Sequence, residues 1–427
     1  MTDLIEAPAP APAAPSPVIP VAGTDPTAPH GRPEPIAATS LTTRLRPLLR
    51  PTAYYIASRV AVLAAALAAT TMFPKLRVVQ SMGSLWDGRW YLKIAQHGYP
   101  HQLVNEGDGS RWAFFPAFPT AVRALAEVTR LSLPDAAFVA AFIFGLTSAL
   151  AIWVAVREVF GARLADRAAL LYVFCPMAYI LSMAYTEGLF LTAAAACLFA
   201  LSRRYWMTAA LCACLAGLTR NTGAVVVLAV IVTAVPAAWR GRSLRPAVAA
   251  AVAPLGLASF MVYSWAMVGT PLAFLTSERF WQGQHFIWFM TPLEGLVAAV
   301  GQGPGGQTFV PDAMAGAALI LGCVGIWLLD RMGRPGGATL VGGGRITIPA
   351  SWWVYTIGAL LAAYSAYFTD SIPRYTMAAF PLFVAFAWAL PRRMDAAVVG
   401  VMACLQGALL IAVLSIAVHP VLVPLVP

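Results

Sequence analysis

The sequence predicts an all-α polytopic membrane protein: a bundle of about eleven transmembrane helices with a long first extracytoplasmic loop that contains amphipathic helices. Of the 427 residues, 60% are hydrophobic and only 11% are charged, and the mean hydropathy is +0.74. A soluble domain cannot cover so apolar a surface with polar groups. The apolar runs are also close to the length of about 20 residues that a helix needs to cross a bilayer.

The candidate spans follow the apolar runs in order. They are residues 53–73, 136–156, 168–185, 188–202, 206–218, 222–238, 247–267, 313–330, 352–368, 376–391 and 396–418. Two neighbouring runs, 206–218 and 222–238, are short for two crossings. The joint between them, Thr219 to Gly223, is therefore expected at membrane depth, where irregular backbone is tolerated only beside a cavity.

Residues 1–40 differ in composition from the rest of the chain. They are rich in alanine and proline and cannot bury a core, so they are predicted to form a disordered cytoplasmic tail. Residues 41–427 then form the multi-pass domain. The tail lacks the basic region and short apolar region of a signal peptide, so the first span is expected to remain as an anchor.

The basic residues predict the orientation. Arg44, Arg46 and Arg50 precede the first span, and a cytoplasmic position for them places alternate arginine-rich loops on the same side. These loops carry Arg157, Arg163 and Arg167; Arg203 and Arg204; Arg240, Arg242 and Arg245; Arg331, Arg334 and Arg345; and Arg392 and Arg393. The net charge of +10 is thus a topology signal spread over six loops, which excludes a nucleic-acid-binding patch.

The cysteines and histidines give no sign of a metal site. All six cysteines lie in apolar runs, the nearest pair is Cys-Ala-Cys, and the five histidines are scattered. We interpret the cysteines as packing residues. No metal and no other cofactor is predicted.

The most informative segment is Trp86 to Tyr99, which is charged and aromatic and follows the first span. Read as a helix, it places Asp87, Tyr91 and Ile94 on one face, together with Trp90. Gly98 and Pro100 are expected to end this helix. Asp87 is either a helix N-cap or a carboxylate that an enzyme could use, and the spacing alone leaves both open.

The first external loop, about residues 74–134, contains further candidates. Trp112 and Phe115 form either an interfacial belt in the lipid headgroups or a wall for a lipid chain or sugar. Glu106 and Asp108 lie in a glycine-rich turn, which favours a solvated loop over a metal site. A loop of this length usually carries function.

Charges at the edges of later spans mark a second group of candidates, because ionisable groups there are costly and tend to be functional. Glu187 and Arg220 lie between apolar runs, and Asp370 and Arg374 flank Pro373, which forbids a simple continuous helix. Each couple is either a structural ion pair or part of a cavity that presents guanidinium groups to a phosphate. Arginine suits bidentate phosphate recognition better than lysine does.

These residue types fit one kind of chemistry on the outer face, where nucleotide sugars are not available. A sugar can arrive there on a lipid phosphate. One carboxylate takes the proton from an acceptor hydroxyl as it attacks the anomeric carbon, and arginines receive the charge that develops on the leaving phosphate. No second carboxylic acid is required, in contrast to glycoside hydrolysis.

The sequence resembles the PIG-V-type mannosyltransferase family of GT-C membrane glycosyltransferases, including its bacterial members. The resemblance lies in motifs spread in order along most of the membrane domain. They are Trp86-Asp87 followed by Ile94-Ala95 and Gly98-Tyr99; Phe114-Phe115-Pro116 with Pro119; Tyr185-Thr186-Glu187; Thr219-Arg220 with Gly223; and Pro373-Arg374-Tyr375 before Phe380-Pro381. The sequence departs from the family's pattern after Arg220, where a proline is expected, and at Gly188, where serine is common.

The resemblance implies a GT-C-type bundle in a bacterial plasma membrane and an inverting transferase. It implies a polyprenyl-phosphate sugar donor, usually of mannose, a lipid or glycan acceptor outside the cytoplasm, and Asp87 as the general base. The predicted substrate-binding residues are Trp86, Arg89, Tyr91, Glu187, Arg220, Asp370, Arg374 and Tyr375. Three alternatives remain: a related transferase that uses arabinofuranose, a transporter or lipid flippase, for which we find no matching broken helices in two halves, and a non-catalytic assembly protein.

Overall fold

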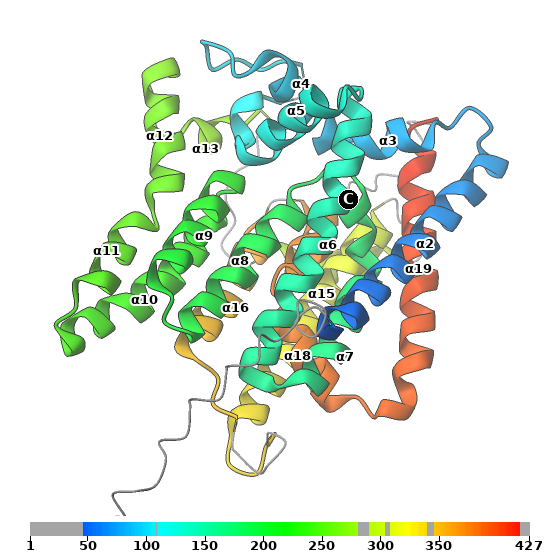
Figure 1. The fold of residues 1–427 in the computed structure, drawn as a ribbon. Helices are drawn as coiled ribbons and strands as arrows, with labels where there is room; N and C mark the ends of the chain where they lie inside the picture. Colours follow the sequence, from blue (N-terminus) through cyan, green and yellow to red (C-terminus); the bar gives the residue numbers. More distant parts are fainter. Residues whose placement is uncertain are drawn as a thin grey trace, which may run out of the picture. The chain divides into compact units, whose positions relative to one another are not determined.

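The structure, a computed structural model, describes residues 46–107, 109–280, 290–303, 308–339, 346–366 and 368–418. In these ranges the chain forms helices joined by short connections (Figure 1). The predicted tail, residues 1–40, lies outside the described residues. The chain divides into two units, residues 1–46 and 47–427, and everything below concerns the second.

The helices confirm the predicted all-α class. They are η1 (Arg46–Leu48), α2 (Leu49–Met72), α3 (Val78–Ser84), α4 (Asp87–His97), η2 (Arg111–Ala113), α5 (Ala117–Thr129), α6 (Leu133–Phe160), α7 (Ala162–Phe174), η3 (Pro176–Ser182), α8 (Glu187–Ser202), α9 (Trp206–Thr219), α10 (Gly223–Gly241), α11 (Leu244–Val252), α12 (Leu255–Val268), α13 (Ala273–Glu278), α14 (Thr291–Gln302), α15 (Phe309–Gly333), α16 (Ala350–Tyr364), η4 (Thr369–Ser371), α17 (Ile372–Met377), α18 (Pro381–Ala389), η5 (Arg392–Met394) and α19 (Asp395–Ser415).

The number of long membrane helices is smaller than predicted. Among the described residues, six helices are long and apolar enough to cross a membrane, and a bent pair makes up to seven. The six are Arg46–Met72, Leu133–Phe160, Gly223–Gly241, Leu244–Val268, Phe309–Gly333 and Arg392–Ser415. The predicted count of eleven is therefore not confirmed. Several apolar runs form short or broken helices, because prolines or turns interrupt them.

The predicted span 168–185 illustrates such a break. α7 ends at Phe174, and η3 continues from Pro176 at an angle of 78°. Pro176 lacks the N–H that a continuing helix needs, so the chain turns there. Likewise, the predicted span 376–391 contains the end of α17 and the nine-residue α18, which starts at Pro381.

A buried arginine in α2 donates hydrogen bonds to polar groups on both sides of the bend between α7 and η3. Arg59 is 2% exposed, although the first span is otherwise apolar. Its Nη1 donates to the carbonyl of Ala178 at 2.8 Å and to the hydroxyl of Ser182 at 2.7 Å, and its Nη2 donates to the carbonyl of Val173 at 3.3 Å. Carbonyls at the end of a broken helix need such donors where water is absent. Arg59 therefore fixes η3, the segment that leads to Glu187.

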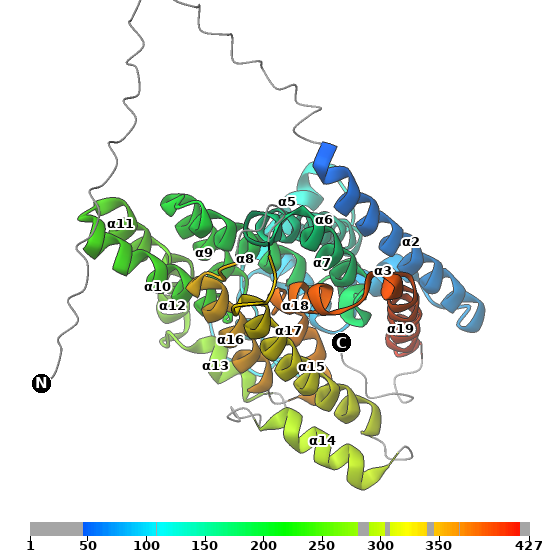
Figure 2. The same ribbon diagram turned by 90° about the horizontal axis from the view of Figure 1, so that it is seen from below.

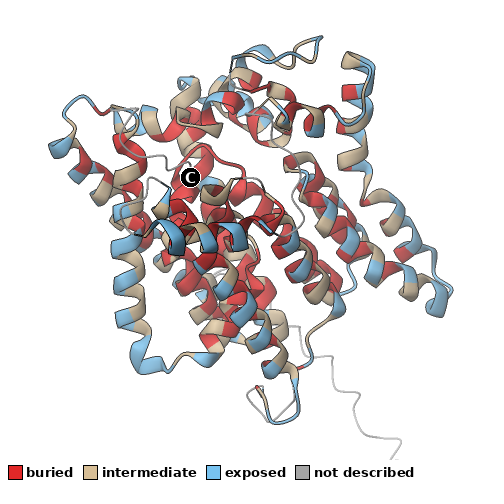
Figure 3. Ribbon diagram, turned by 180° about the vertical axis from the view of Figure 1, so that it is seen from behind, coloured by how far each residue is buried: buried red, intermediate tan, exposed pale blue. Residues whose placement is uncertain are grey.

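The short helices α3, α4 and α5 lie together at one end of the helical bundle (Figure 1). Seen along the bundle, the membrane-length helices stand around α8 and α18 (Figure 2). Buried residues concentrate in the interior of the bundle, while α11, α12 and α19 contain many exposed residues (Figure 3). Exposed apolar side chains such as Val262, Trp265 and Val401 are suited to contact lipid.

Candidate active site

Two segments a hundred residues apart meet at the start of α4. The backbone N–H of Ala184 donates to the carbonyl of Met82 in α3 at 2.8 Å. Gly88, in the first turn of α4, allows the close approach, because a Cβ there would lie only 3.2 Å from the Cβ of Ala184. This docking brings Asp87 next to the Tyr185-Thr186-Glu187 segment.

Asp87 is the first residue of α4, as the helical reading of this segment predicts, and Gly98 ends the helix. The N-cap position belongs to Trp86, and no side chain caps the helix there. The carboxylate of Asp87 instead accepts a hydrogen bond from Arg374 Nη1 at 2.9 Å. The interpretation of Asp87 as an N-cap is therefore wrong.

Glu187 is the first residue of α8 and forms an ion pair with Arg220. Its Oε1 also lies 3.5 Å from Arg374 Nε. Arg374 thus stands between the two carboxylates and connects the two ion pairs. We call Asp87, Glu187, Arg220 and Arg374 the acid–arginine cluster.

The members of this cluster differ in their exposure. The side chain of Asp87 is 27% exposed and that of Arg220 is 14% exposed, whereas those of Arg374 and Glu187 are 3% and 1% exposed. Asp87 and Arg220 are therefore partly exposed, whereas Glu187 and Arg374 are buried. Buried charges of this kind need both partners, because each alone is strongly unfavourable.

Two tyrosine rings hold Arg374 in place. Its guanidinium lies 4.8 Å from the ring of Tyr185 and 4.6 Å from the ring of Tyr375, and Nη2 donates to the hydroxyl of Tyr375 at 2.8 Å. Arg220 lies 4.9 Å from the same Tyr375 ring. Stacking of this kind fixes a planar guanidinium in a way that lysine cannot reproduce. Tyr185 is not among the substrate-binding residues predicted from the sequence, although the Tyr185-Thr186-Glu187 motif is noted there.

Helix ends supply the later members of the cluster. α9 ends at Thr219, and Arg220 follows in extended conformation with φ −159° and ψ 155°. α17 begins at Ile372 with Pro373 in its first turn, where the missing N–H costs nothing. As the sequence predicts, no long continuous helix runs through Pro373, because the six-residue α17 begins one residue before it. Arg374, the next residue, contacts Asp87 of α4 and Glu187 of α8.

Trp86 joins α3 to α4 in an unusual conformation. Its φ of 52° is rare for a residue with a side chain, and its indole Nε1 is buried without a hydrogen-bond acceptor in the described part of the chain. Backbone strain of this kind is concentrated at functional sites.

Tyr91, Arg89 and Asp370 occupy different surroundings. Tyr91 is buried against Phe114 and Phe118, with ring centroids 5.2 and 5.3 Å apart. Burial, and next the charge of Asp87, raise the pKa of Tyr91, so its phenol stays protonated. Arg89 is exposed, with its guanidinium 5.3 Å from the Trp90 ring. Asp370 lies in η4, one turn before Arg374.

The glycine-rich turn of the first loop has a structural role. Both oxygens of Glu106 accept from Arg111 Nε, at 2.9 and 3.1 Å, and Arg111 Nη1 donates to the carbonyl of Gly98 at 2.7 Å. This pair fastens the loop to the end of α4. Asp108 lies outside the described residues, and no group of three potential metal ligands occurs within the described ranges.

The aromatic run in this loop is buried. Trp112 is 0% exposed and Phe115 is 3% exposed, and both pack against Phe260 of α12. They therefore do not form a belt on the protein surface, and they support the loop from inside.

Comparison with protein families gives a partial match. Residues 116–265 match the family described as dolichyl-phosphate-mannose-protein mannosyltransferase. The matched segment includes Glu187 and Arg220 but neither Asp87 nor Arg374. No curated protein matches the chain.

Comparison with solved structures gives the oligosaccharyltransferase of Archaeoglobus fulgidus. Its apo form is 15% identical, with a TM-score of 0.47 over 84% of this chain and 56% of that chain. The complex with zinc and sulfate is 15% identical, with a TM-score of 0.45 over 82% and 53%. The enzyme AglB of that organism, in complex with an inhibitory peptide and a dolichol-phosphate, is 14% identical, with a TM-score of 0.33 over 84% and 50%. The chain spans about half the length of these proteins.

The partial family match and the membrane-length helices together support the class of membrane glycosyltransferases.

Proposed function

We propose that this protein is an inverting glycosyltransferase of the PIG-V type, which moves mannose from a polyprenyl-phosphate donor to a lipid or glycan acceptor on the outer face of a bacterial plasma membrane. The observation that carries the proposal is the arrangement of the acid–arginine cluster. One carboxylate, Asp87, is accessible and oriented by a buried arginine, and an accessible arginine, Arg220, lies in the same cluster.

In the proposed reaction Asp87 accepts the proton of an acceptor hydroxyl. The hydroxyl oxygen forms a bond to the anomeric carbon, while the bond from that carbon to the phosphate oxygen breaks and its electron pair goes to the phosphate. Arg220 neutralises the charge that develops there. The hydroxyl attacks the anomeric carbon from the side opposite to the leaving phosphate, so the configuration at that carbon inverts.

Arg374 has a different role in this proposal from the one that the sequence predicts. Its side chain is 3% exposed and is occupied by Asp87, Glu187 and Tyr375. We therefore assign it as the residue that positions Asp87, and we assign phosphate recognition to Arg220. Glu187 compensates the charge of both arginines.

The family match supports a mannosyl donor on a lipid phosphate, because that is the donor named in the family's description. The motifs shared with the PIG-V type contain all four members of the cluster, Asp87, Glu187, Arg220 and Arg374. Alternation of the arginine-rich loops supports an outer position for α4.

Product analysis tests the reaction. Purified protein in detergent is incubated with a radiolabelled polyprenyl-phosphate mannose and a total lipid extract as the acceptor source, and products are separated by chromatography. We expect a labelled glycolipid or free mannose from hydrolysis, and neither with Asp87→Asn. Intact donor after incubation with the wild-type protein contradicts the proposal.

Thiol labelling tests the side of the membrane. Gln102, in the loop after α4, and Ser243, between α10 and α11, are both exposed. In a background without native cysteines, an impermeant reagent added to intact cells is expected to label Gln102→Cys and to leave Ser243→Cys unlabelled. The reverse pattern places the cluster on the cytoplasmic face.

A further inference from the structure

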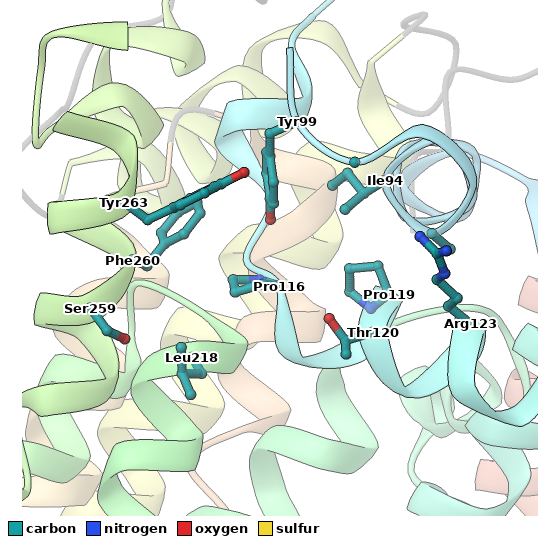
Figure 4. A pocket seen from close by; sticks show the side chains of 12 residues that line it. Ile94, Tyr99, Pro116, Pro119, Thr120, Arg123, Leu218, Ser259, Phe260 and Tyr263 are labelled. Atoms are coloured by element: carbon teal, nitrogen blue, oxygen red, sulfur yellow. The ribbon is translucent and has the colours of Figure 1, made fainter. Parts of the chain in front are cut away.

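Cavities lie at both ends of the membrane-length segment Leu244–Val268. One of them, of about 450 Å³, is lined by Tyr263 and by residues of α4, the helix that begins at Asp87 (Figure 4). The other, of about 430 Å³, is lined by Leu244 and lies between α10 and α11. Leu244 and Tyr263 are separated by about 28 Å along a helix, which is close to the thickness of the hydrocarbon core. The second cavity, which we call the α10–α11 cavity, therefore lies near the opposite membrane surface.

The α10–α11 cavity combines apolar walls with a guanidinium group. Val235, Leu244 and Ala247 contribute apolar lining, and Arg242 contributes the charged group. Trp239, which also lines the cavity, is 84% exposed, and Leu244 is 82% exposed. Exposed tryptophans of this kind are typical of the headgroup level of a membrane. The cavity is thus placed where a lipid headgroup meets its acyl chains.

The positive charge beside this cavity is not compensated by the protein. Arg240, Arg242 and Arg245 are all exposed, and none of them forms an ion pair within the described ranges. The sequence contains no acidic residue between Glu187 and Glu278. Every other arginine-rich loop takes part in an ion pair, and these pairs are Arg50–Asp166, Arg167–Asp395, Arg203–Glu158 and Arg334–Asp330. The turn between α10 and α11 therefore offers its arginines to an anion from outside the chain.

We propose that the α10–α11 cavity binds an anionic phospholipid. The guanidinium of Arg242 pairs with the phosphate of the headgroup, and an acyl chain lies beside Leu244 and Val248, which is 47% exposed. Membrane topology alone requires basic residues at this surface but no cavity next to them, whereas basic pockets between membrane helices are suited to anionic headgroups. The inference goes beyond the proposed function, because this binding needs neither a sugar donor nor an acceptor.

One pair of variants tests the charge. Arg242 follows α10 in the left-handed conformation, with φ 43°, where glycine is favoured, so Arg242→Gly should fold at least as well as the wild-type protein. Arg130 is a matched control. It follows α5 in the same conformation, with φ 63°, is exposed, and does not line the cavity.

A second pair of variants tests the cavity itself. Ala247 lines the cavity, whereas Ala251, one turn later in α11, does not, and both are exposed. Ala247→Trp therefore fills the cavity from its wall, and Ala251→Trp adds the same side chain to the same helix outside it. Because both positions are exposed, neither variant overpacks the core.

Native mass spectrometry of the full chain in detergent measures the binding. The probes are palmitoyl-oleoyl phosphatidylglycerol and phosphatidylcholine with the same acyl chains. We expect tighter binding of phosphatidylglycerol, and a loss of its affinity in Arg242→Gly and Ala247→Trp of about fivefold, the contribution of one arginine near an anionic lipid surface. Arg130→Gly and Ala251→Trp should bind as the wild-type protein does.

Equal affinity of the wild-type protein for the two lipids overturns the inference. So does an Arg242→Gly or Ala247→Trp protein that binds phosphatidylglycerol as tightly as its control. Glycerol 3-phosphate, which carries the phosphate without acyl chains, is not expected to displace the lipid. Displacement by an equal concentration of glycerol 3-phosphate contradicts the assignment of the cavity to a phospholipid.

Discussion

The site contains two acid–arginine pairs of the same chemical type in different surroundings. Asp87 and Arg374 meet where a surface helix joins the bundle, and Glu187 and Arg220 meet where two helix ends adjoin inside it. Asp87 is 27% exposed, but Glu187 is 1% exposed. The comparison teaches that exposure, and not residue type, separates the acid that can exchange a proton with a ligand from the acid that holds the site together.

Substitution of the exposed acid is expected to have the largest effect on catalysis. Asp87→Asn keeps the shape of the side chain and an acceptor for Arg374 but removes the base, so turnover should fall about 100-fold to 10,000-fold. The melting temperature should fall less than in Glu187→Gln, because Arg374 keeps Glu187 as a counter-charge, and donor binding should change little. Radiolabelled transfer and thermal unfolding in detergent check this. Transfer within a few-fold of wild type refutes the role of Asp87 as the base.

Substitution of the buried acid is expected to act on stability. Glu187→Gln leaves Arg220 and Arg374 without their shared counter-charge, and breaking a buried pair costs about 3–5 kcal/mol. Thermal unfolding should show a large fall in melting temperature together with lost activity. Glu127→Gln is the control, since its pair with Arg123 is exposed on both sides and should change little. An unchanged melting temperature for Glu187→Gln contradicts the distinction between the two acids.

Lysine substitutions should separate the two arginines by kinetics. Arg374→Lys loses the planar group that reaches Asp87, Glu187 and Tyr375 together, so kcat should fall about tenfold with KM for the donor unchanged. Arg220→Lys retains charge but loses bidentate recognition, so KM for the donor should rise by a similar factor. Steady-state kinetics at varied donor concentration measures kcat and KM separately for each variant. If both variants change the same constant, the division of roles is wrong.

The last expected effect concerns the helix packing at Gly188, next to Glu187. A Cβ at Gly188 would lie 2.8 Å from the backbone of Phe144 and Gly145, because α6 and α8 cross closely there. Gly188→Ser, the residue common in the PIG-V type, should therefore cost about 1–3 kcal/mol of stability through overpacking. Gly400→Ser in α19, where nothing lies within 4 Å, is the control. Equal melting temperatures for the two variants contradict the steric explanation.

The sequence was sufficient to predict the helical class and the helix from Asp87 to His97. Hydropathy indicates which segments lie in the membrane, and the spacing of apolar residues indicates a helix. The sequence also identified the residues of the cluster as candidates, because charge at the edge of an apolar run is costly. It named Glu187 with Arg220 as a couple, and the structure pairs them, but it grouped Arg374 with Asp370 and did not predict that Arg374 pairs with Asp87. The pairing of Asp87 with Arg374 joins residues 287 positions apart, and only the docking of α4 on the bundle brings them together.

The number of spans was harder to predict for a related reason. Hydropathy reports that residues 168–185 are apolar, but it does not report that the helix breaks at Pro176, because the break is stabilised by Arg59 from another helix. Arg59 itself escaped notice as one charge in a long apolar run. A charge inside a span together with a proline in a later span is the signal that could have found this contact.

Arg59 also affects how the protein is made. An arginine near the middle of an isolated helix opposes membrane insertion by about 2.5–3.5 kcal/mol, and the carbonyl of Val173 that accepts from it is synthesised 114 residues later. The emerging α2 therefore carries an unsatisfied charge during synthesis until α7 and η3 follow. Its stable place in the bilayer depends on those later helices, so α2 is expected to stay in contact with the insertion machinery until they arrive.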